Sequence, residues 1–287
     1  MAPSTHLAYQ QGLKAFDEFC NEKGIAYTWP IQSNIIMHFI AHLSLNGKSV
    51  STAKTYLAGI SSKHKLNGWN DPTDTFMIRK LLQGFARSVP QNDTRCPITF
   101  HKLLQLIPAL DNICSNKYET LLFTAAFTAA FFGFFRISEM IGKSNDTQSG
   151  LEVSDVKILT SSLKVKLRSS KTDQIGRGEI INMASVLGSP TICPVQSLSR
   201  YLEVRPKSVK KLFVHRNGSQ LTRYQFQMVL KKASNFLGWQ PNQFSSHSFR
   251  IGAATTAAMN GMSESWIMKK GRWKSGAVKS YFRVELV

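Results

Sequence analysis

Apolar side chains recur every three or four residues through the first ninety positions of the chain, which is the spacing of one face of an α-helix. In residues 5–22, the positions Leu7, Leu13, Phe16 and Phe19 fall on roughly one such face. Three further stretches show the same period, and they read WPIQSNIIMHFIAHLSLNGK, TAKTYLAGISSKHKLNG and MIRKLLQGFARS. The pattern therefore predicts four helices.

Capping and turn residues mark the ends of these helices. Asn46-Gly47 stops the second helix, Ser49 or Ser51 can cap the third, and Asp71-Pro72 opens the fourth. The last two helices also carry basic residues, which form either a solvated surface or a surface that faces nucleic acid. We expect the second for Lys54, Lys63, Arg79, Lys80 and Arg87.

A polar stretch, VPQNDTRCP at residues 89–97, carries two prolines and interrupts the helical period. Such a break in pattern and composition is typical of a linker between domains. We therefore expect a helical domain in residues 1–90, a linker in residues 91–97 and a second domain in residues 98–287.

The second domain begins and ends with helical patterns and changes character between them. Residues 151–183 contain the β-rich runs LEVSDVKIL, SLKVKLRSS and GEIINM, separated by polar turns, which predict a small antiparallel sheet. Helical periods cover residues 99–141, 194–205 and 222–237, and they resume from residue 247. The predicted fold class is mainly α with a small antiparallel β-sheet (α+β).

Positive charge is the exceptional feature of the composition. The chain has 36 Lys and Arg against 17 Asp and Glu, a net charge of +19. Residues 1–95 carry +4 of this charge and residues 96–287 carry +15. An excess of this size implies a polyanionic partner, either nucleic acid or an anionic membrane surface. Because no long Lys/Arg run carries the charge, a folded surface shaped for nucleic acid is favoured over a basic tail.

Cysteine spacing and hydropathy indicate the cellular compartment in which the protein acts. The run LLFTAAFTAAFFGFF, residues 121–135, ends at Arg136 and is too short to span a bilayer, so we expect a buried core helix and no membrane partner. The N-terminal MAPSTHLAYQ has no apolar signal core. Four cysteines without metal-finger spacing predict free thiols in a reducing compartment, and they are Cys20, Cys96, Cys114 and Cys193.

Two arginines have settings that suit a phosphate. Arg136 directly follows the apolar run, where a charge is costly unless it is paired or used, and Glu139 stands three residues later. His247 and Arg250 stand three apart at the start of a predicted helix, whose first N–H groups also favour an anion. The alternatives are a structural Arg–Glu pair and a capping histidine beside a surface arginine.

A lysine and a tyrosine extend this candidate set. Lys171, in LRSSKTDQIGRG, lies on a turn between two β runs, from which its amine could reach a DNA groove and protonate a leaving oxygen. Tyr281 ends a helical stretch, and its phenol becomes a nucleophile only when guanidinium groups and a base lower the cost of the phenolate. Taken alone, each has an ordinary alternative, a surface lysine and a half-buried packing residue.

In combination, these residues resemble the tyrosine recombinase (phage integrase-like) family. The order is Arg136 with Glu139 as its support, a lysine on a β-turn, His-x-x-Arg, a Gly-Arg-Trp segment and a terminal tyrosine. The wording SKTDQ, SHSFRIGAATTAA and GRWKS…YFR is most similar to the eukaryotic transposon branch, the Crypton and DIRS-type recombinases. The resemblance covers nearly the whole chain.

This resemblance implies a core-binding domain and a catalytic domain that close on double-stranded DNA as a clamp. It also implies a homo-oligomer, a dimer or tetramer on DNA, with no cofactor. If the source is eukaryotic, the protein acts in the nucleus, and RPKSVKK at 205–211 is a short candidate import signal. The implied reaction is DNA cleavage and rejoining without metal or ATP.

The resemblance assigns a role to each matching residue. Arg136 and Arg250 would clamp the scissile phosphate. Lys171 would protonate the departing 5′ oxygen, and His247 would contact the phosphate or accept the tyrosine proton. Tyr281 would attack phosphorus and leave a 3′-phosphotyrosine.

Two features depart from the family pattern. The family usually places His or Trp nine residues before the tyrosine, and here that position is Arg272. Trp273 follows, and WKS fits the family's His-x-Ser wording after a local shift. We therefore expect Trp273 in the site, where it can donate or pack, and Arg272 in support as a phosphate contact. Only FRVELV follows Tyr281, whereas many relatives use a longer tail to dock onto a neighbouring subunit.

Two other functions stay open from the sequence. Ala257, Gly261 and Ile267 have the spacing of a helix-turn-helix with SESWIMKKGRW as its recognition helix. The chain would then be a DNA-binding regulator or a domesticated, catalytically silent recombinase, and Arg136 and Tyr281 would have no explanation. A monomeric type IB topoisomerase would use the same chemistry as a recombinase.

Overall fold

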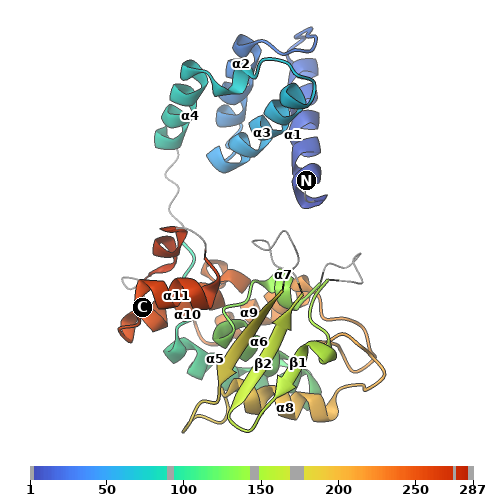
Figure 1. Ribbon diagram of the computed structural model, residues 1–287, viewed down its shortest axis with the longest axis vertical. Coiled ribbons are helices and arrows are strands. Elements are labelled where there is room, and N and C mark those ends of the chain that lie inside the picture. The colour runs from blue at the N-terminus through green and yellow to red at the C-terminus, as the bar shows by residue number, and fades with distance from the viewer. Residues whose placement is uncertain (1–2, 89–93, 143–148, 169–177, 274–275, 284–287) are drawn as a thin grey trace. The chain divides into compact units, whose positions relative to one another are not determined.

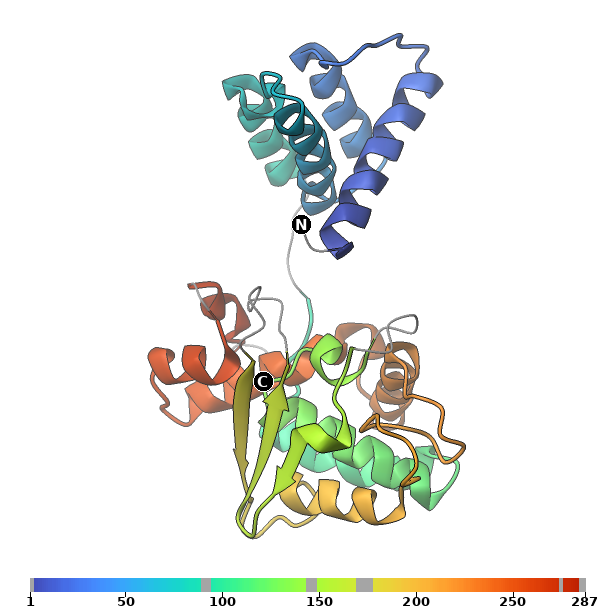
Figure 2. The ribbon, with the colours of Figure 1, turned by 45° about the vertical axis from the view of Figure 1, so that its right-hand side comes forward.

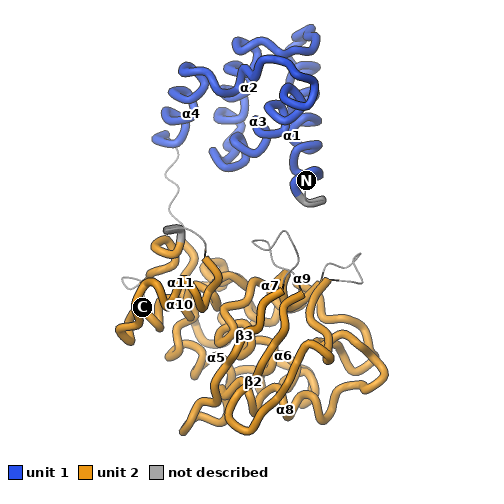
Figure 3. The backbone as a smooth tube through the Cα atoms, in the orientation of Figure 1, with its two compact units in different colours: residues 1–93 blue, residues 94–287 orange. Residues whose placement is uncertain are grey.

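The computed structural model divides the chain into two compact units, residues 1–93 and 94–287 (Figure 1, Figure 3). The expected linker, residues 91–97, spans this division, and each unit has its own hydrophobic core. The structure describes residues 3–88, 94–142, 149–168, 178–273 and 276–283.

Unit 1 contains the four helices expected from the apolar period. Phe16, Phe39 and Ile60 come from three of these helices and are fully buried at the centre of the unit. The rings of Phe16 and Phe39 meet edge to face with centroids 5.3 Å apart. The helices are α1 (Pro3–Glu22), α2 (Ser33–Leu45), α3 (Val50–Leu66) and α4 (Phe76–Ser88).

One helix end of unit 1 is as the sequence predicts, and another is not. Ser49 caps α3, because its hydroxyl accepts a hydrogen bond of 3.0 Å from the backbone N–H three residues later. The expectation that Asp71-Pro72 opens the fourth helix is wrong. Asp71 instead caps a 3₁₀ turn, Pro72–Asp74, by accepting from the backbone N–H of Thr73, and the helix begins at Phe76.

Unit 2 is built around α6 (Lys117–Phe132), the helix of the apolar run. Phe127 is fully buried, and the rings of Phe226 and Phe249 pack on it with centroids 4.8 and 4.9 Å away. Within the part of the chain that the structure describes, no helix is long and apolar enough to cross a membrane. The other helices are α5 (Phe100–Ile113), α7 (Ile137–Met140), α8 (Pro194–Val204), α9 (Arg223–Phe236), α10 (Ser246–Met259) and α11 (Glu264–Gly271).

A three-stranded antiparallel sheet covers one side of these helices (Figure 2). The strands run in the order β1 (Val156–Ile158), β2 (Ser162–Leu167) and β3 (Glu179–Ala184), as the β-rich runs predict. Val165 of β2 pairs with Val156 on one side and Ile181 on the other. Lys171 falls between β2 and β3 in residues 169–177, outside the described residues.

The basic run 205–211 has a structural role. Arg205 is only 4% exposed, and its Nη2 donates to the carbonyl oxygens of Val209 and Lys211 at 2.6 and 2.7 Å. The Lys211 ammonium in turn lies 3.3 Å from the carboxylate of Glu152. Lys207 and Lys210 of the same run are exposed, and its use as an import signal stays a prediction.

The chain enters unit 2 across the face of α10. Cys96 donates its backbone N–H to the carbonyl of Gln243 at 2.8 Å, and Ile98 donates to the carbonyl of Ser248 at 2.9 Å. A Cβ on Gly252 would lie 1.8 Å from the carbonyl oxygen of Ile98. Glycine is therefore required where this segment crosses the helix that carries the His-x-x-Arg pair.

Replacing this glycine tests the crossing. Gly252→Ala should lower the free energy of unfolding of unit 2 by about 1–3 kcal/mol, because the added methyl forces the backbone of Ile98 away from α10. The matched control is Gly84→Ala in α4, where a Cβ would meet nothing within 4 Å. That change should stabilise unit 1 by up to about 1 kcal/mol, because alanine favours a helix. Chemical denaturation of both variants measures the difference, and an undisturbed unit 2 in Gly252→Ala would contradict the close approach.

Candidate active site

The chain leaves α6 through a tight reversal that sets the first part of the site. Phe134 has a positive φ of 50°, and a Cβ on Gly133 would lie 2.2 Å from the ring of Phe135. The reversal places Arg136 at the start of α7. Arg136 donates from its backbone N and from Nη1 to the two carboxylate oxygens of Glu139, each at 2.9 Å. The Glu139 side chain is 3% exposed and that of Arg136 is 18% exposed.

The first turn of α10 supplies the second part. Ser245 caps this helix and accepts a hydrogen bond from the backbone N of His247 at 3.3 Å. Arg250 lies one turn later and is fully buried. Its Nη1 donates to the carbonyl oxygen of Phe134, and its Nη2 donates to that of Gly271. Arg250 therefore joins the turn after α6 to the end of α11.

The end of α11 folds the tryptophan back over Arg250. A Cβ on Gly271 would lie 1.7 Å from the ring of Trp273, so this fold requires glycine. The Arg250 guanidinium carbon lies 4.2 Å from the centroid of the Trp273 ring, in a cation–π contact. The ring of Phe134 also meets the Trp273 ring edge to face, with the two centroids 6.3 Å apart. Trp273 thus packs against both Arg250 and Phe134.

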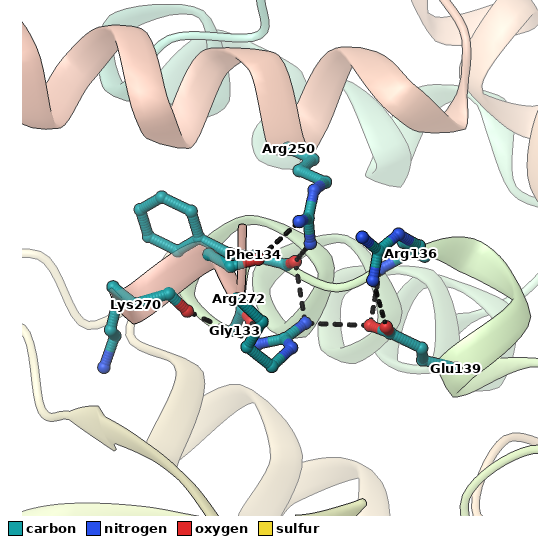
Figure 4. A network of polar contacts seen from close by, with 8 residues as sticks. Gly133, Phe134, Arg136, Glu139, Arg250, Lys270 and Arg272 are labelled. Atoms are coloured by element: carbon teal, nitrogen blue, oxygen red, sulfur yellow. Dashed lines mark hydrogen bonds and ion pairs between the residues drawn. The ribbon is translucent and has the colours of Figure 1, made fainter. Parts of the chain in front are cut away.

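Arg272 lies between Gly271 and Trp273 and adopts the left-handed conformation, with φ 60° and ψ 43°. Its side chain is 3% exposed. Its Nη2 donates to a carboxylate oxygen of Glu139 at 2.8 Å and to the carbonyl of Phe134 at 3.0 Å, and its Nη1 donates to the carbonyl of Gly133 at 3.1 Å. Figure 4 shows these contacts.

Tyr281 ends a 3₁₀ turn and joins the cluster through its ring. The ring centroid lies 4.8 Å from that of Trp273 and 6.4 Å from that of His247. It lies 6.0 Å from the guanidinium carbon of Arg250. The backbone of Tyr281 is held by Thr255 of α10, whose hydroxyl donates to the Tyr281 carbonyl at 3.1 Å.

The cluster carries an excess of positive charge. In the described part of the chain, Arg136 and Arg272 are both paired with the single carboxylate of Glu139, and Arg250 has carbonyl partners (Figure 4). Burial lowers the pKa of Arg250, and the charges of Arg136 and Arg272 lower it further. Three cations against one anion attract a further anion. Among the residues that the structure describes, no group of three His, Cys, Asp or Glu side chains is placed to hold a metal ion.

Most of the expected site residues converge. Trp273, and not Arg272, packs against the tyrosine ring. The expectation that Arg272 contacts phosphate is wrong in this structure, because its buried guanidinium is engaged by Glu139 and two carbonyls. Lys171 lies outside the described residues. The residues that the structure brings together are Arg136, Glu139, His247, Arg250, Arg272, Trp273 and Tyr281.

The five basic residues expected to face DNA lie in unit 1, on α3 and α4. The Lys63 ammonium lies 4.0 Å from the centroid of the Trp29 ring. Arg79 pairs with Asp74 at 3.2 Å, and both side chains are exposed. The remaining three have exposed side chains, and they are Lys54, Lys80 and Arg87.

The helix-turn-helix spacing corresponds to a real helix pair, α10 and α11. Gly261 supplies the positive φ of 74° in the turn, and Ala257 and Ile267 are buried. Lys270 of α11 donates to the carbonyl of Asn182 in β3. These two helices carry the His-x-x-Arg and Gly-Arg-Trp segments. The helix-turn-helix spacing is therefore explained by the packing of α10 on α11, which brings these segments together.

Sequence reasoning missed two contributors. The carbonyl of Phe134 accepts from both Arg250 and Arg272, and a backbone acceptor leaves no signal in residue type. Thr255 anchors the backbone of Tyr281. Its only signal was a polar pair inside the otherwise apolar AATTAA.

The phage integrase family model matches residues 97–285 of this chain. A relative described as an integrase/recombinase xerD homolog, from Selenomonas ruminantium, is 25% identical over 285 residues. That match covers 96% of this chain and 79% of the relative.

Solved structures share the fold at low identity. The Tn1549 transposon integrase in complex with transposon right end DNA has a TM-score of 0.68 at 13% identity, covering 99% of this chain and 90% of that one. The XerH site-specific recombinase bound to a palindromic difH substrate has a TM-score of 0.67 at 15% identity, covering 96% and 74%. A lambda integrase dimer bound to a COC′ core site has a TM-score of 0.65 at 15% identity, covering 99% and 73%. Since the family model spans nearly all of unit 2, the chain belongs to the phage integrase family and is a tyrosine recombinase.

Proposed function

We propose that this recombinase cuts and rejoins double-stranded DNA through a covalent bond between Tyr281 and the 3′ phosphate of the cut strand. The observation that supports the proposal most is the convergence of the Tyr281 ring with the Arg250 guanidinium and the His247 imidazole. These groups come from segments far apart in the sequence, and a nucleophile, a cation and a base are what phosphoryl transfer to a phenol needs.

In this proposal the arginines hold the scissile phosphate. Arg136 is 18% exposed and can present its free N–H groups to a phosphate oxygen. Arg250 is buried under the rings of Trp273 and Tyr281, so a phosphate reaches it only after these rings move off the guanidinium. Guanidinium groups stay charged at physiological pH and offset the charge that develops on the phosphate oxygens.

Two further residues handle protons. His247, beside the Tyr281 ring, accepts the phenol proton or contacts the phosphate. Lys171, placed by the sequence in the turn between β2 and β3, protonates the departing 5′ oxygen. The phosphotyrosine retains the energy of the broken phosphodiester bond, because one ester replaces another. Rejoining is then the reverse attack by a 5′ hydroxyl and requires no ATP.

The proposal extends to the partners. Unit 1 adds DNA affinity through the basic side chains of α3 and α4, and two or four copies assemble on the DNA. The lambda integrase match is a dimer on its core site, which supports the same for this chain. Relaxation of supercoiled DNA by a monomer, without strand exchange, would instead identify a type IB topoisomerase.

We also propose that the protein belongs to the eukaryotic transposon branch and acts in the nucleus. The wording SKTDQ, SHSFRIGAATTAA and GRWKS supports this branch. The Tn1549 match supports a mobile element as the source of the gene, although that element's integrase shares only the fold at 13% identity. Microscopy of a tagged chain in its own cells tests the location, and exclusion from the nucleus would rule it out.

The nucleophile is tested with a nicked suicide substrate, from which the short 5′ fragment diffuses away. Wild-type protein should accumulate an adduct that resists detergent and is digested by protease, and it should do so in EDTA. Tyr281→Phe removes one oxygen and should abolish the adduct while leaving DNA binding nearly unchanged, because the ring keeps its contacts with Trp273. Gel analysis and mass spectrometry of the digested adduct give the result.

Tyr201 and Tyr224 provide matched controls for that experiment. Tyr201 is fully buried and hydrogen-bonded to the Val214 carbonyl, whereas Tyr224 is 72% exposed. Neither should carry the nucleotide. An adduct that persists in Tyr281→Phe would mean that another residue is the nucleophile, and no adduct from wild type on its authentic site would favour a DNA-binding regulator.

The role of the lysine is tested through the leaving group. Lys171→Ala should cleave an ordinary substrate slowly, by a factor of about 10²–10⁴, because general acid catalysis contributes that much. A substrate with a 5′-bridging sulfur has a leaving group that needs no proton, so the variant should approach the wild-type rate on it. Single-turnover rates on the two substrates decide, and an equal defect on both would show that Lys171 is not the acid.

The contribution of Trp273 is tested by two substitutions. Trp273→Phe keeps an aromatic face over Arg250 and should cleave at nearly the wild-type rate if the indole only packs. Trp273→Ala removes that face and the contact with Tyr281, and it should slow cleavage more than it weakens DNA binding. Cleavage rate and DNA affinity are measured on both variants. A Trp273→Ala protein with normal cleavage would exclude the residue from the site.

A further inference from the structure

We infer that Arg272 is a positioning residue that fixes both phosphate-binding arginines at once, a role that rests on the proposed function. Its Nη2 donates to Glu139 at 2.8 Å, and Glu139 is the carboxylate that holds Arg136. The same Nη2 donates to the Phe134 carbonyl at 3.0 Å, which is an acceptor for Arg250. One planar group thus contacts the partner of each arginine (Figure 4).

The contact with Glu139 controls where Arg136 points. Glu139 gives one oxygen to Arg136 Nη1 and the other to Arg272 and to the Arg136 backbone N–H. Without the second guanidinium, the buried carboxylate has one cation left and can turn both oxygens toward it, since bidentate pairing is the preferred arrangement. Arg136 would then be drawn toward Glu139 and away from a phosphate.

The contact with the Phe134 carbonyl controls Arg250 in the same way. Phe134 lies in the left-handed region at φ 50°, a conformation that costs free energy for a residue with a side chain and persists only when its surroundings hold it. Arg272 holds the turn from one side by donating to the carbonyls of Gly133 and Phe134. If the turn relaxes, the acceptor that orients Arg250 moves with it.

Arg272 does not act on the phosphate itself. Its side chain is 3% exposed, and its Nη1 and Nη2 donate to Glu139 and to the carbonyls of Gly133 and Phe134. A lysine would not replace it, because one ammonium on a flexible stem lacks the planar fork that reaches a carboxylate and two carbonyls together. This role of Arg272 therefore requires the planar guanidinium and not merely a positive charge.

The test compares Arg272→Lys and Arg272→Gln with wild type in single-turnover cleavage of the suicide substrate at saturating DNA. Rates are taken per active site, from the final adduct amplitude, so that unfolded protein does not count. Both variants should cleave roughly 100-fold more slowly, the size of effect expected when a reacting group is misplaced by about 1 Å. DNA affinity should stay unchanged, because Arg272 makes no contact with DNA. Arg272→Lys keeps the buried cation, so it remains informative if Arg272→Gln fails to fold.

A second buried arginine of unit 2 provides the matched control. Arg205 is 4% exposed and also donates to two backbone carbonyls, but these carbonyls belong to Val209 and Lys211 of the basic run 205–211, outside the cluster. Arg205→Lys and Arg205→Gln should lower stability and leave the cleavage rate per active site at the wild-type value. A merely structural role for Arg272 would give this same pattern.

A double-mutant cycle with Glu139→Gln adds a specific signature. Because Arg272 acts through Glu139, the double variant Arg272→Gln with Glu139→Gln should cleave no more slowly than the slower single variant. Additive losses, or a normal rate per active site in Arg272→Lys, would overturn the inference. Failure of the proposed function looks different, because wild-type protein would then form no adduct at Tyr281.

Discussion

Three guanidinium groups packed beside a single carboxylate are the constraint on which the rest of unit 2 depends. Mutual repulsion and lost hydration disfavour such a cluster. The fold offsets this cost with backbone carbonyls from two helix ends. Gly133 and Phe134 directly follow α6, Gly271 is the last residue of α11, and the terminal carbonyls of a helix carry partial negative charge. The ends of two helices therefore hold the cations.

Bringing two helix ends to the same cations requires unusual backbone. Phe134 and Arg272 both adopt positive φ, although neither is glycine. The neighbouring glycines, Gly133 and Gly271, supply space and not conformational freedom, since a Cβ at either would collide with the ring of Phe135 or Trp273. The strain is concentrated at the two turns whose carbonyls bind Arg250, which is typical of functional sites. The Gly-Arg-Trp segment is thus one unit: the glycine makes room, the arginine turns inward, and the tryptophan covers Arg250.

The sequence predicted the elements well because they are set by local patterns. Apolar periods gave the helices, and alternation gave the sheet whose Val165 is paired on both sides. The order of Arg136, Arg250 and Tyr281 was found through a family resemblance, and no local pattern could show that they meet. Arg272 was misjudged because a surface-like Lys-Lys-Gly-Arg wording hides a left-handed residue that points into the core. The Phe134 carbonyl could not be predicted at all, since backbone acceptors are placed by tertiary packing.

In the proposed function, the rings that cover Arg250 link the Tyr281 nucleophile to the phosphate site. Trp273 and Tyr281 lie over a guanidinium that has no exposed surface, so a phosphate and these rings compete for the same group. In the proposed reaction, binding of the phosphate therefore displaces the Tyr281 ring, and this ring carries the attacking hydroxyl. The Tyr281 backbone can move only a short way, because the Thr255 hydroxyl donates to the Tyr281 carbonyl and accepts from the backbone N of Arg283. In this proposal the hydroxyl is released close to the phosphorus that it attacks, and without a bound phosphate the phenol ring stays packed against Trp273.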